Sequence, residues 1–329
     1  MKKFIINIAF FILLVVCAFL CCEIIFREFI KYDIDEHIEA SILNFEEKSN
    51  KINYIFLGDS EVYYGIDPKY IQLENAHNFS FPSEPIQTTY WKVKYYFEQK
   101  KLKNLKTVFL LFEKRMINDI NRIGLRTILD YSKYYNYYFD DIISQMHLRD
   151  KFHFWLELNF DIIRLKPSYK KKVTQGLENL NKNIYSEVLE KTGYSMRDYA
   201  LKVDIFENMK SEQIIERKRT INTPENDSPL KYYRKLIELF ETNNVKIIFF
   251  NMPDISILLN DIDELQIKGI FDEVIAKEYF PKIPFINCRV KPELWELNDF
   301  SDGDHLNAKG AKKIAEVFNK EIKTRLPIK

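Results

Sequence analysis

The sequence predicts an α/β fold with a parallel β-sheet, preceded by one apolar segment that is able to span a membrane. Short apolar runs alternate with segments of helical periodicity across residues 51–112 and 230–325, an alternation typical of βαβ units. Between about 115 and 230 the chain is charged and aromatic, with patterns of helical spacing. This middle stretch therefore indicates a helical insertion in the sheet domain.

The apolar segment lies at the N-terminus. Phe4 to Cys22 reaches roughly 28 Å as a helix, about the thickness of the hydrocarbon core of a bilayer. A cleaved signal peptide is the alternative, but its apolar region is usually shorter and ends in a small-x-small site, which this segment lacks. Lys2 and Lys3 favour a cytoplasmic N-terminus. We therefore expect a single-pass protein of the cell membrane whose body is extracytoplasmic. The expected parts are an anchor at 1–30, a juxtamembrane connector at 31–50, and an α/β domain at 51–329 that carries the insertion at about 115–230.

Each expected strand is a short apolar run, and the first two stop at residues that end strands. The first run stops at Gly58 and the second at Pro82. The helices have apolar residues three and four positions apart, and Pro68 and Pro229 suit a first helical turn. The expected strands are 53–57, 76–81, 107–112, 245–250 and 284–288. The expected helices are 84–100, 228–242 and 311–322, with a short helix opening at 67, mixed helix at 255–280, and helical patterns at 125–148 and 177–215.

Composition excludes some classes of function. The net charge is +1, from 49 basic and 48 acidic residues, which argues against a nucleic-acid-binding protein. Of the four cysteines only Cys288 lies outside the apolar segment, and its place at the end of an expected strand favours a core position. The spacing of cysteine and histidine does not match a zinc site. We expect no metal and no organic cofactor.

Two short motifs carry the candidate chemistry. Gly58-Asp59-Ser60 follows the first strand directly, and Asp302-Gly303-Asp304-His305 lies far downstream, before the last helix. Sites in parallel sheets form beyond the carboxyl ends of the strands, which is where Ser60 falls. A serine hydroxyl becomes a nucleophile when a histidine takes its proton and a carboxylate orients that histidine. Ser60, His305 and Asp302 are therefore the candidate catalytic residues.

Other interpretations exist for each motif. Asp304 is a competing carboxylate, although a residue adjacent to His305 in a turn generally points away from the ring, so we prefer Asp302. Asp59-Ser60 can also serve only as a helix cap, and Asp302-Gly303 can be an ordinary turn. The joint occurrence of the motifs, in this order along an α/β pattern, favours the catalytic interpretation.

The motifs resemble a known superfamily. Leu57-Gly58-Asp59-Ser60 and the segment Asp302 to Asn307, with Gly310, are similar to the first and last blocks of the SGNH/GDSL hydrolases. The resemblance covers about residues 53–112 and 230–325. It implies a flavodoxin-like three-layer fold, with Ser60 as nucleophile, His305 as base and Asp302 as the orienting carboxylate.

Within that superfamily the chain resembles membrane-anchored proteins of the bacterial envelope. The N-terminal anchor, together with the residues after Ser60 and the run Gly65-Ile66-Asp67-Pro68, is similar to polysaccharide O-acetyltransferase-like proteins and to the D-alanine transfer proteins of teichoic acid synthesis. The resemblance implies an acyl donor, a glycan acceptor, and a multi-spanning membrane O-acyltransferase as a partner that delivers the acyl group.

The groups that would stabilise an oxyanion depart from the superfamily pattern. The superfamily takes donors from a Gly in its second block and an Asn in its third, whereas the second block here contains no Gly and the third expected strand ends in Phe112-Glu113-Lys114. Removing one such donor costs about 10²–10³ in rate in a known protease. The remaining candidate donors are Ser60, Ser80, Ser83, Asn78 and Asn251.

Two functions from different classes follow. The first is a membrane-anchored, extracytoplasmic serine acyl-transfer enzyme, either an O-acetyltransferase or an esterase, that acts on a cell-envelope polysaccharide. The second is a non-catalytic envelope assembly protein that binds a glycan or a membrane acyltransferase, which the altered oxyanion blocks favour. A soluble secreted lipase or esterase is a third alternative. We favour the enzyme, and the reactivity of Ser60 discriminates between the first two.

Overall fold

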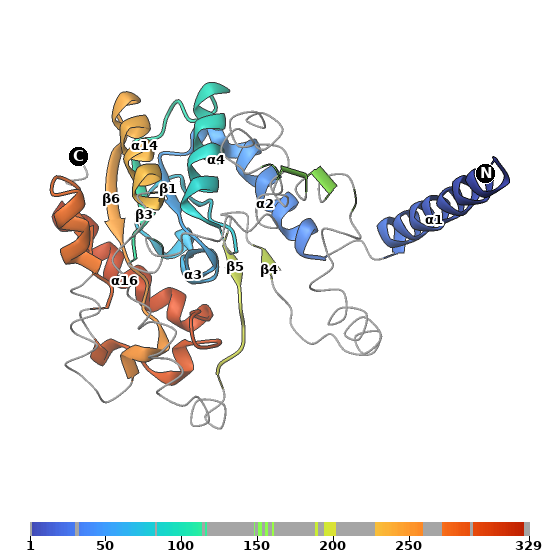
Figure 1. Cartoon of the computed structure of the whole chain (residues 1–329). Coiled ribbons are helices and arrows are strands. Elements are labelled where there is room, and N and C mark those ends of the chain that lie inside the picture. The colour runs from blue at the N-terminus through green and yellow to red at the C-terminus, as the bar shows by residue number, and fades with distance from the viewer. Residues whose placement is uncertain are drawn as a thin grey trace. The chain divides into compact units, whose positions relative to one another are not determined.

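The computed structural model of the chain describes part of its length (Figure 1). The described residues are 2–29, 33–82, 84–113, 116, 148, 151–152, 155–156, 160, 188–189, 194–201, 228–258, 272–289 and 292–325. The chain divides into two compact units, one formed by Met1–His37 and Ile128–Ile184 and the other by Ile38–Thr127 and Tyr185–Lys329. Most of the expected insertion at 115–230, including the helical pattern at 125–148, lies outside the described residues.

The second unit contains a parallel sheet of five strands. Its strands are β1 (Tyr54–Leu57), β2 (Ala76–Asn78), β3 (Thr107–Leu111), β6 (Lys246–Phe250) and β7 (Phe285–Ile286). Their order across the sheet is β2-β1-β3-β6-β7, and every pairing is parallel. Counted within this sheet alone, the order is 2-1-3-4-5, one of the two common orders of doubly wound folds. The expected α/β fold with a parallel sheet is confirmed.

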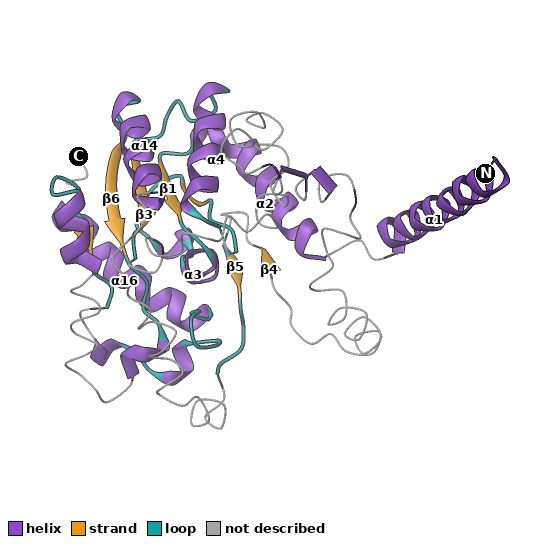
Figure 2. Cartoon of the chain, in the orientation of Figure 1, coloured by secondary structure: helices purple, strands orange, loops and turns teal. Residues whose placement is uncertain are grey.

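Helices cover both faces of this sheet, which makes three layers (Figure 2). Successive side chains on a strand point to opposite faces, so Phe249 and Phe250 of β6 identify the two faces. Phe249 contacts Tyr233 of α14 (Ser228–Thr242), which packs beside α4 (Ile86–Glu98). Phe250 contacts Phe318 of α16 (Ala308–Arg325), which packs against the short helix α3 (Ser60–Gly65).

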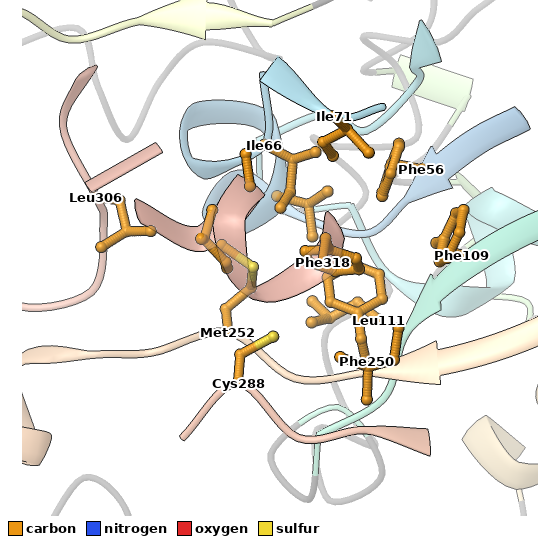
Figure 3. Packing of buried hydrophobic residues seen from close by; sticks show 14 of the residues in the cluster. Phe56, Ile66, Ile71, Phe109, Leu111, Phe250, Met252, Cys288, Leu306 and Phe318 are labelled. Carbon is orange, nitrogen blue, oxygen red and sulfur yellow. The ribbon is translucent and has the colours of Figure 1, made fainter. Parts of the chain in front are cut away.

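In the core under α16, aromatic rings pack among aliphatic side chains (Figure 3). The ring of Phe318 lies 5.6 Å from that of Phe56, 5.8 Å from that of Phe109 and 5.2 Å from that of Phe250, each in an edge-on arrangement. Such pairs add about 0.5–1.5 kcal/mol beyond the burial of their area. Phe318 thus fixes the last helix to the three central strands. The same core contains Cys288, as expected, and burial raises the pKa of its thiol.

The segment 194–201 differs from expectation. The helical pattern at 177–215 is wrong at its described residues, because Val188–Leu189 and Ser195–Met196 pair as the antiparallel strands β4 and β5. The backbone of this segment is bonded to the chain near residue 300: the Leu201 N–H donates to the Phe300 carbonyl at 2.8 Å. A partner so distant in the sequence overrides the local periodicity.

The N-terminal helix α1 (Lys2–Phe29) belongs to the first unit. Its stretch Lys3–Ile24 has 22 residues, and the most apolar part of this stretch has a mean hydropathy of 3.0 and contains no buried residue. It is long and apolar enough to cross a membrane, a test that a signal sequence also passes. The expected connector at 31–50 contains the helix α2 (Asp33–Lys48), whose Phe45 stacks on Phe79 at a centroid distance of 3.7 Å.

Candidate active site

Ser60 lies where β1 turns into α3. Asp59 caps this helix, since its carboxylate accepts the Glu61 N–H at 3.0 Å, so the capping interpretation of the motif is correct for Asp59. At Gly58 an added Cβ would lie 2.4 Å from Val62 Cγ2 and 2.9 Å from Leu111 Cβ. Glycine therefore permits this tight turn, which places Ser60 at the carboxyl edge of the sheet as the first residue of α3.

Asp302 and His305 lie in one closed loop. Phe300 and Leu306 form an isolated antiparallel bridge at its base, and Ser301 N–H donates to the His305 carbonyl at 2.9 Å. Inside the loop, Asp302 Oδ1 accepts the backbone N–H of Asp304 at 2.9 Å and that of His305 at 3.0 Å. The loop is thus the turn that the sequence indicates, and its hydrogen bonds hold the Asp302 carboxylate beside the His305 ring.

The structure brings the three candidate catalytic residues together. His305 Nε2 lies 2.8 Å from Ser60 Oγ, and His305 Nδ1 lies 2.8 Å from Asp302 Oδ1. With the proton on Nδ1, the ring donates to Asp302 and accepts from the Ser60 hydroxyl, the arrangement of a serine nucleophile with its base. The carboxylate on the ring is that of Asp302, whereas Asp304 enters the loop through its backbone N–H.

Electrostatics keep Asp302 ionised. Burial opposes its charge, but the hydrogen bond from His305, the charge of that ring, the Asp304 N–H and the Arg197 guanidinium together outweigh burial. They hold the pKa of Asp302 well below its usual range. A carboxylate that stays anionic can stabilise the imidazolium that forms when His305 takes a proton.

Arg197 is a member of this site that the sequence analysis did not find. Its Nη1 lies 2.7 Å from Asp302 Oδ2 and 3.4 Å from Ser301 Oγ, and its Cζ lies 3.6 Å from the centroid of the Tyr64 ring. Tyr64 in turn presents an edge-on contact to the His305 ring, with centroids 5.3 Å apart. A single arginine in a segment whose pattern predicts a helix gives no sequence signal for such a role.

A buried ionic network lies beyond the ends of β3, β6 and β7. Arg289 Nη2 is 2.9 Å from Glu113 Oε1, and its Nη1 is 3.3 Å from Asp254 Oδ2. Glu113 Oε1 also accepts the Met252 N–H at 2.9 Å. From the same loop, the N–H of Ile255 donates to the Gly303 carbonyl at 3.2 Å. The network therefore supports the loop that carries Asp302 and His305.

Three of the candidate oxyanion donors are engaged in the fold. Asn78 Nδ2 donates to the carbonyls of Val62 and Ile66 at 2.7 and 2.8 Å. The Ser80 N–H donates to Asn78 Oδ1 at 3.1 Å, and its hydroxyl lies 3.4 Å from the Phe56 carbonyl. Asn251 Nδ2 lies 3.2 Å from both an Asp272 and an Asn287 oxygen. Two further candidates are the Ser60 N–H, in the first turn of α3, and Ser83, which lies outside the described residues.

Comparisons with known proteins were made for sequence and for structure. No established protein-family profile matches the chain, and no curated protein sequence matches it. Among solved structures, the chain is similar to that of a GDSL-like lipase from Bacteroides thetaiotaomicron, with 10% sequence identity and a TM-score of 0.38. That similarity covers 89% of this chain and 100% of the other. By its own structure, the chain is an α/β protein with a Ser–His–Asp arrangement at the carboxyl edge of a parallel sheet.

Proposed function

We propose that this chain is a serine acyl-transfer enzyme, with esterase or O-acetyltransferase activity, that acts on a cell-envelope polysaccharide from a membrane anchor. The observation that carries the proposal is the pair of 2.8 Å contacts that connect Ser60 Oγ, the His305 ring and Asp302. Hydroxyl, imidazole and carboxylate in this order convert a weak nucleophile into an effective one.

The reaction follows from these positions. Ser60 Oγ attacks the acyl carbonyl carbon, and its proton passes to His305 Nε2, which leaves a tetrahedral oxyanion and an imidazolium paired with Asp302. As the oxyanion collapses, the bond to the leaving alcohol breaks, and that alcohol takes the proton from His305. The second half repeats these steps with a hydroxyl of a sugar, or of water, as the nucleophile that frees Ser60. Transfer and hydrolysis differ only in this acceptor.

The oxyanion requires a donor aimed at it. In the first turn of a helix the backbone N–H groups have no partner within the helix, and Ser60 opens α3. We assign the Ser60 N–H as one donor, because it is carried by the nucleophile itself. The Ser83 N–H remains the candidate for the second. An enzyme with one donor fewer than usual is expected to be slower by about 10²–10³.

The N-terminal segment supports the proposed location, and the resemblance of the motifs supports the proposed acceptor. The stretch Lys3–Ile24 has the length and apolar character of a transmembrane helix, and Lys2 and Lys3 favour a cytoplasmic N-terminus. An envelope polysaccharide, an acetyl group and a multi-spanning acyltransferase partner follow from the resemblance of the sequence motifs to anchored envelope proteins. An acyl donor and a glycan acceptor complete the proposed set of partners.

A non-catalytic assembly protein is the second candidate. The observation that favours it is that Asn78, Ser80 and Asn251 all have their donors engaged within the fold. In this case the same site would bind a glycan or a membrane acyltransferase without forming an acyl-enzyme.

Labelling with a fluorophosphonate tests the enzyme. The full chain in detergent is treated with the probe beside Ser60→Ala and His305→Ala, and Ser49→Ala serves as the control because its hydroxyl bonds to the Glu46 carbonyl before β1. We expect labelling of the wild type and of the control, and its loss in both site variants. Folded proteins that all remain unlabelled would contradict the enzyme and favour the assembly protein.

A further inference from the structure

The returning end of the long middle stretch contacts the candidate site. Residues 194–201 lie in the second half of this stretch in the sequence, and their backbone is hydrogen-bonded on both sides of the loop that carries Asp302 and His305. The Leu201 N–H donates to the Phe300 carbonyl at 2.8 Å, and the Ala308 N–H donates to the Arg197 carbonyl at 3.0 Å. Arg197 is therefore fixed by main-chain contacts at the base of this loop.

Its side chain joins the two halves of the site. The guanidinium donates to Asp302 Oδ2 at 2.7 Å on one side and lies over the ring of Tyr64 on the other. Tyr64 belongs to α3, the helix that Ser60 opens, whereas Asp302 belongs to the loop of the base. The Arg197 side chain is 12% exposed, while that of Asp302 is 42% exposed. Arg197 thus covers Oδ2 of the partly exposed Asp302 carboxylate.

We propose that Arg197 is a positioning residue of the Ser–His–Asp site, which holds Asp302 in the orientation that receives the His305 ring. The inference rests on the proposed function. With this role for Arg197, the segment at 194–201 takes part in the chemistry of the site and not only in the fold of the middle stretch.

The geometry requires arginine in particular. A guanidinium is planar, so it can donate to a carboxylate in its plane while an aromatic ring covers its face. A lysine ammonium carries the same charge but cannot both stack and donate in a fixed direction. Lysine at this position would therefore keep the electrostatic effect and lose part of the positioning effect.

The charge of Arg197 also acts directly on Asp302. Burial raises the pKa of the Asp302 carboxyl, and the guanidinium is one of the groups that together hold this pKa below its usual range. The other titratable groups beside Arg197 are Tyr64 and Tyr199, and Asp304 contacts Asp302 through its backbone N–H.

The test compares Arg197→Gln and Arg197→Lys in the full chain, with Arg234→Gln as the control that removes an exposed arginine from α14. The rate of fluorophosphonate labelling is measured from pH 5 to 9. For Arg197→Gln we expect the labelling rate to fall by about 10- to 100-fold, the loss that follows when a group that orients a metal ligand is removed from a metalloenzyme. Arg197→Lys, which keeps the charge but not the planar fork, should show an intermediate rate.

A second readout separates this inference from the proposed function. The hydrogen bond from His305 Nδ1–H to Asp302 is followed by NMR of the chain with isotope-labelled histidines, and the ring-proton signal is assigned with His305→Gln. We expect this signal to move in Arg197→Gln, to move less in Arg197→Lys and to stay in Arg234→Gln. An unchanged signal in Arg197→Gln would overturn the role of Arg197. A wild type that is not labelled by the fluorophosphonate, with a signal that moves in Arg197→Gln, would overturn the enzyme but leave the positioning contact standing.

Discussion

The two oxygens of Asp302 share the His305 ring and otherwise have different partners. Nδ1 of that ring lies 2.8 Å from Oδ1 and 2.9 Å from Oδ2; Oδ1 also accepts two backbone N–H groups of its own loop, and Oδ2 accepts the Arg197 guanidinium. One carboxylate therefore shapes the loop, fixes the tautomer of the ring and pairs with a cation from a distant segment. A substitution at this residue disturbs several of these functions at once unless it keeps the size of the side chain.

Asp302→Asn keeps the size and removes the charge. The amide can present an N–H to Nδ1, which favours the wrong tautomer of His305 and leaves Ser60 without a base. In a known serine protease the same change lowers kcat by about 10⁴. We expect the rate of hydrolysis of p-nitrophenyl acetate to fall by about 10³–10⁴ relative to the wild type.

Asp304→Asn is the matched control. The same change in charge is made two residues away, at a residue that contacts Asp302 through its backbone N–H. We expect its rate to stay within about threefold of the wild type, since surface charges contribute little. Equal losses in the two variants would contradict the assignment of Asp302.

The residues of the site differ in how far the sequence can predict them. Ser60, Asp302 and His305 lie in short motifs whose local turns already place the reacting groups, so a pattern is sufficient. The engagement of Asn78 and Asn251 depends on carbonyls and carboxylates brought near by the fold, and no local pattern encodes these partners. Arg197 is the extreme case, because its partner Asp302 is 105 positions away in the sequence.

At the scale of elements, a buried ion pair connects α4 with the segment after β2. Lys92 Nζ lies 2.7 Å from Glu84 Oε2, and neither side chain is exposed. The ammonium also contacts the faces of Phe79 and Phe81, at 4.3 and 4.2 Å from their centroids. Burial lowers the pKa of Lys92 to about 8, with the charge of Glu84 acting in the opposite direction. Burial also raises the pKa of Glu84, with the charge of Lys92 acting in the opposite direction.

Lys92→Met leaves the Glu84 carboxylate buried without its cation. We expect a loss of about 3–5 kcal/mol in the free energy of unfolding, whereas the double variant with Glu84→Met recovers most of it. The midpoint of urea unfolding, followed by tryptophan fluorescence, measures both. Lys94→Met on the same helix removes only a partly exposed pair with Glu98 and should cost no more than about 0.5 kcal/mol. If Lys94→Met costs as much as Lys92→Met, burial of the pair is not what matters.

The turn between β1 and α3 gives a second prediction at this scale. In Gly58→Ala the new methyl group meets Val62 and Leu111, so the turn must shift, at a cost of about 1–3 kcal/mol. Because Ser60 follows this turn, its labelling rate should fall as well. Adding Val62→Ala removes the nearest atom, so the loss of stability in the double variant should be smaller than the sum of the two single losses. Strict additivity in urea unfolding would argue against the clash.

The elements were predictable where burial alone determines them. Strands covered on both faces are continuous apolar runs, and β1, β3 and β6 fall within the expected ranges 53–57, 107–112 and 245–250. The second strand ends at Asn78, earlier than expected, since the Asn78 side chain bonds to the backbone of α3 and the following loop. Strands β4 and β5 have two residues each and, within the described part of the chain, pair with one another. Two residues are too few for a periodic pattern to show.

At the scale of the whole molecule, the N-terminal helix leads to a test of location. We expect the full chain to stay in the membrane pellet after an alkaline carbonate wash, with its N-terminal residues still present by mass spectrometry. Leu13→Arg with Val16→Arg should release it, because each arginine near the helix centre costs about 2.5–3.5 kcal/mol of insertion free energy. A wild-type chain that begins after residue 22 would show instead that the segment is a cleaved signal.

The side of the membrane is a separate question. Lys231 is exposed on α14, whereas Cys288 is buried, so Lys231→Cys provides a reactive thiol in the body of the protein. An extracytoplasmic body predicts labelling by a membrane-impermeant maleimide in intact cells, at the level reached after lysis. The unmodified chain controls for Cys17, Cys21 and Cys22. Labelling that requires lysis would place the body in the cytoplasm.

The distance along the chain between Ser60 and His305 also sets the time at which the site can form. The two residues are 245 positions apart, whereas Asp302 and His305 lie in the same small loop. At about 5–20 residues per second, the nucleophile leaves the ribosome roughly 12–50 s before its base. Through that interval the hydroxyl is an ordinary alcohol, since the histidine that takes its proton has not yet been made. Reactivity then arrives in a single event, when the last segment docks, so an unfinished chain stays inert toward activated esters.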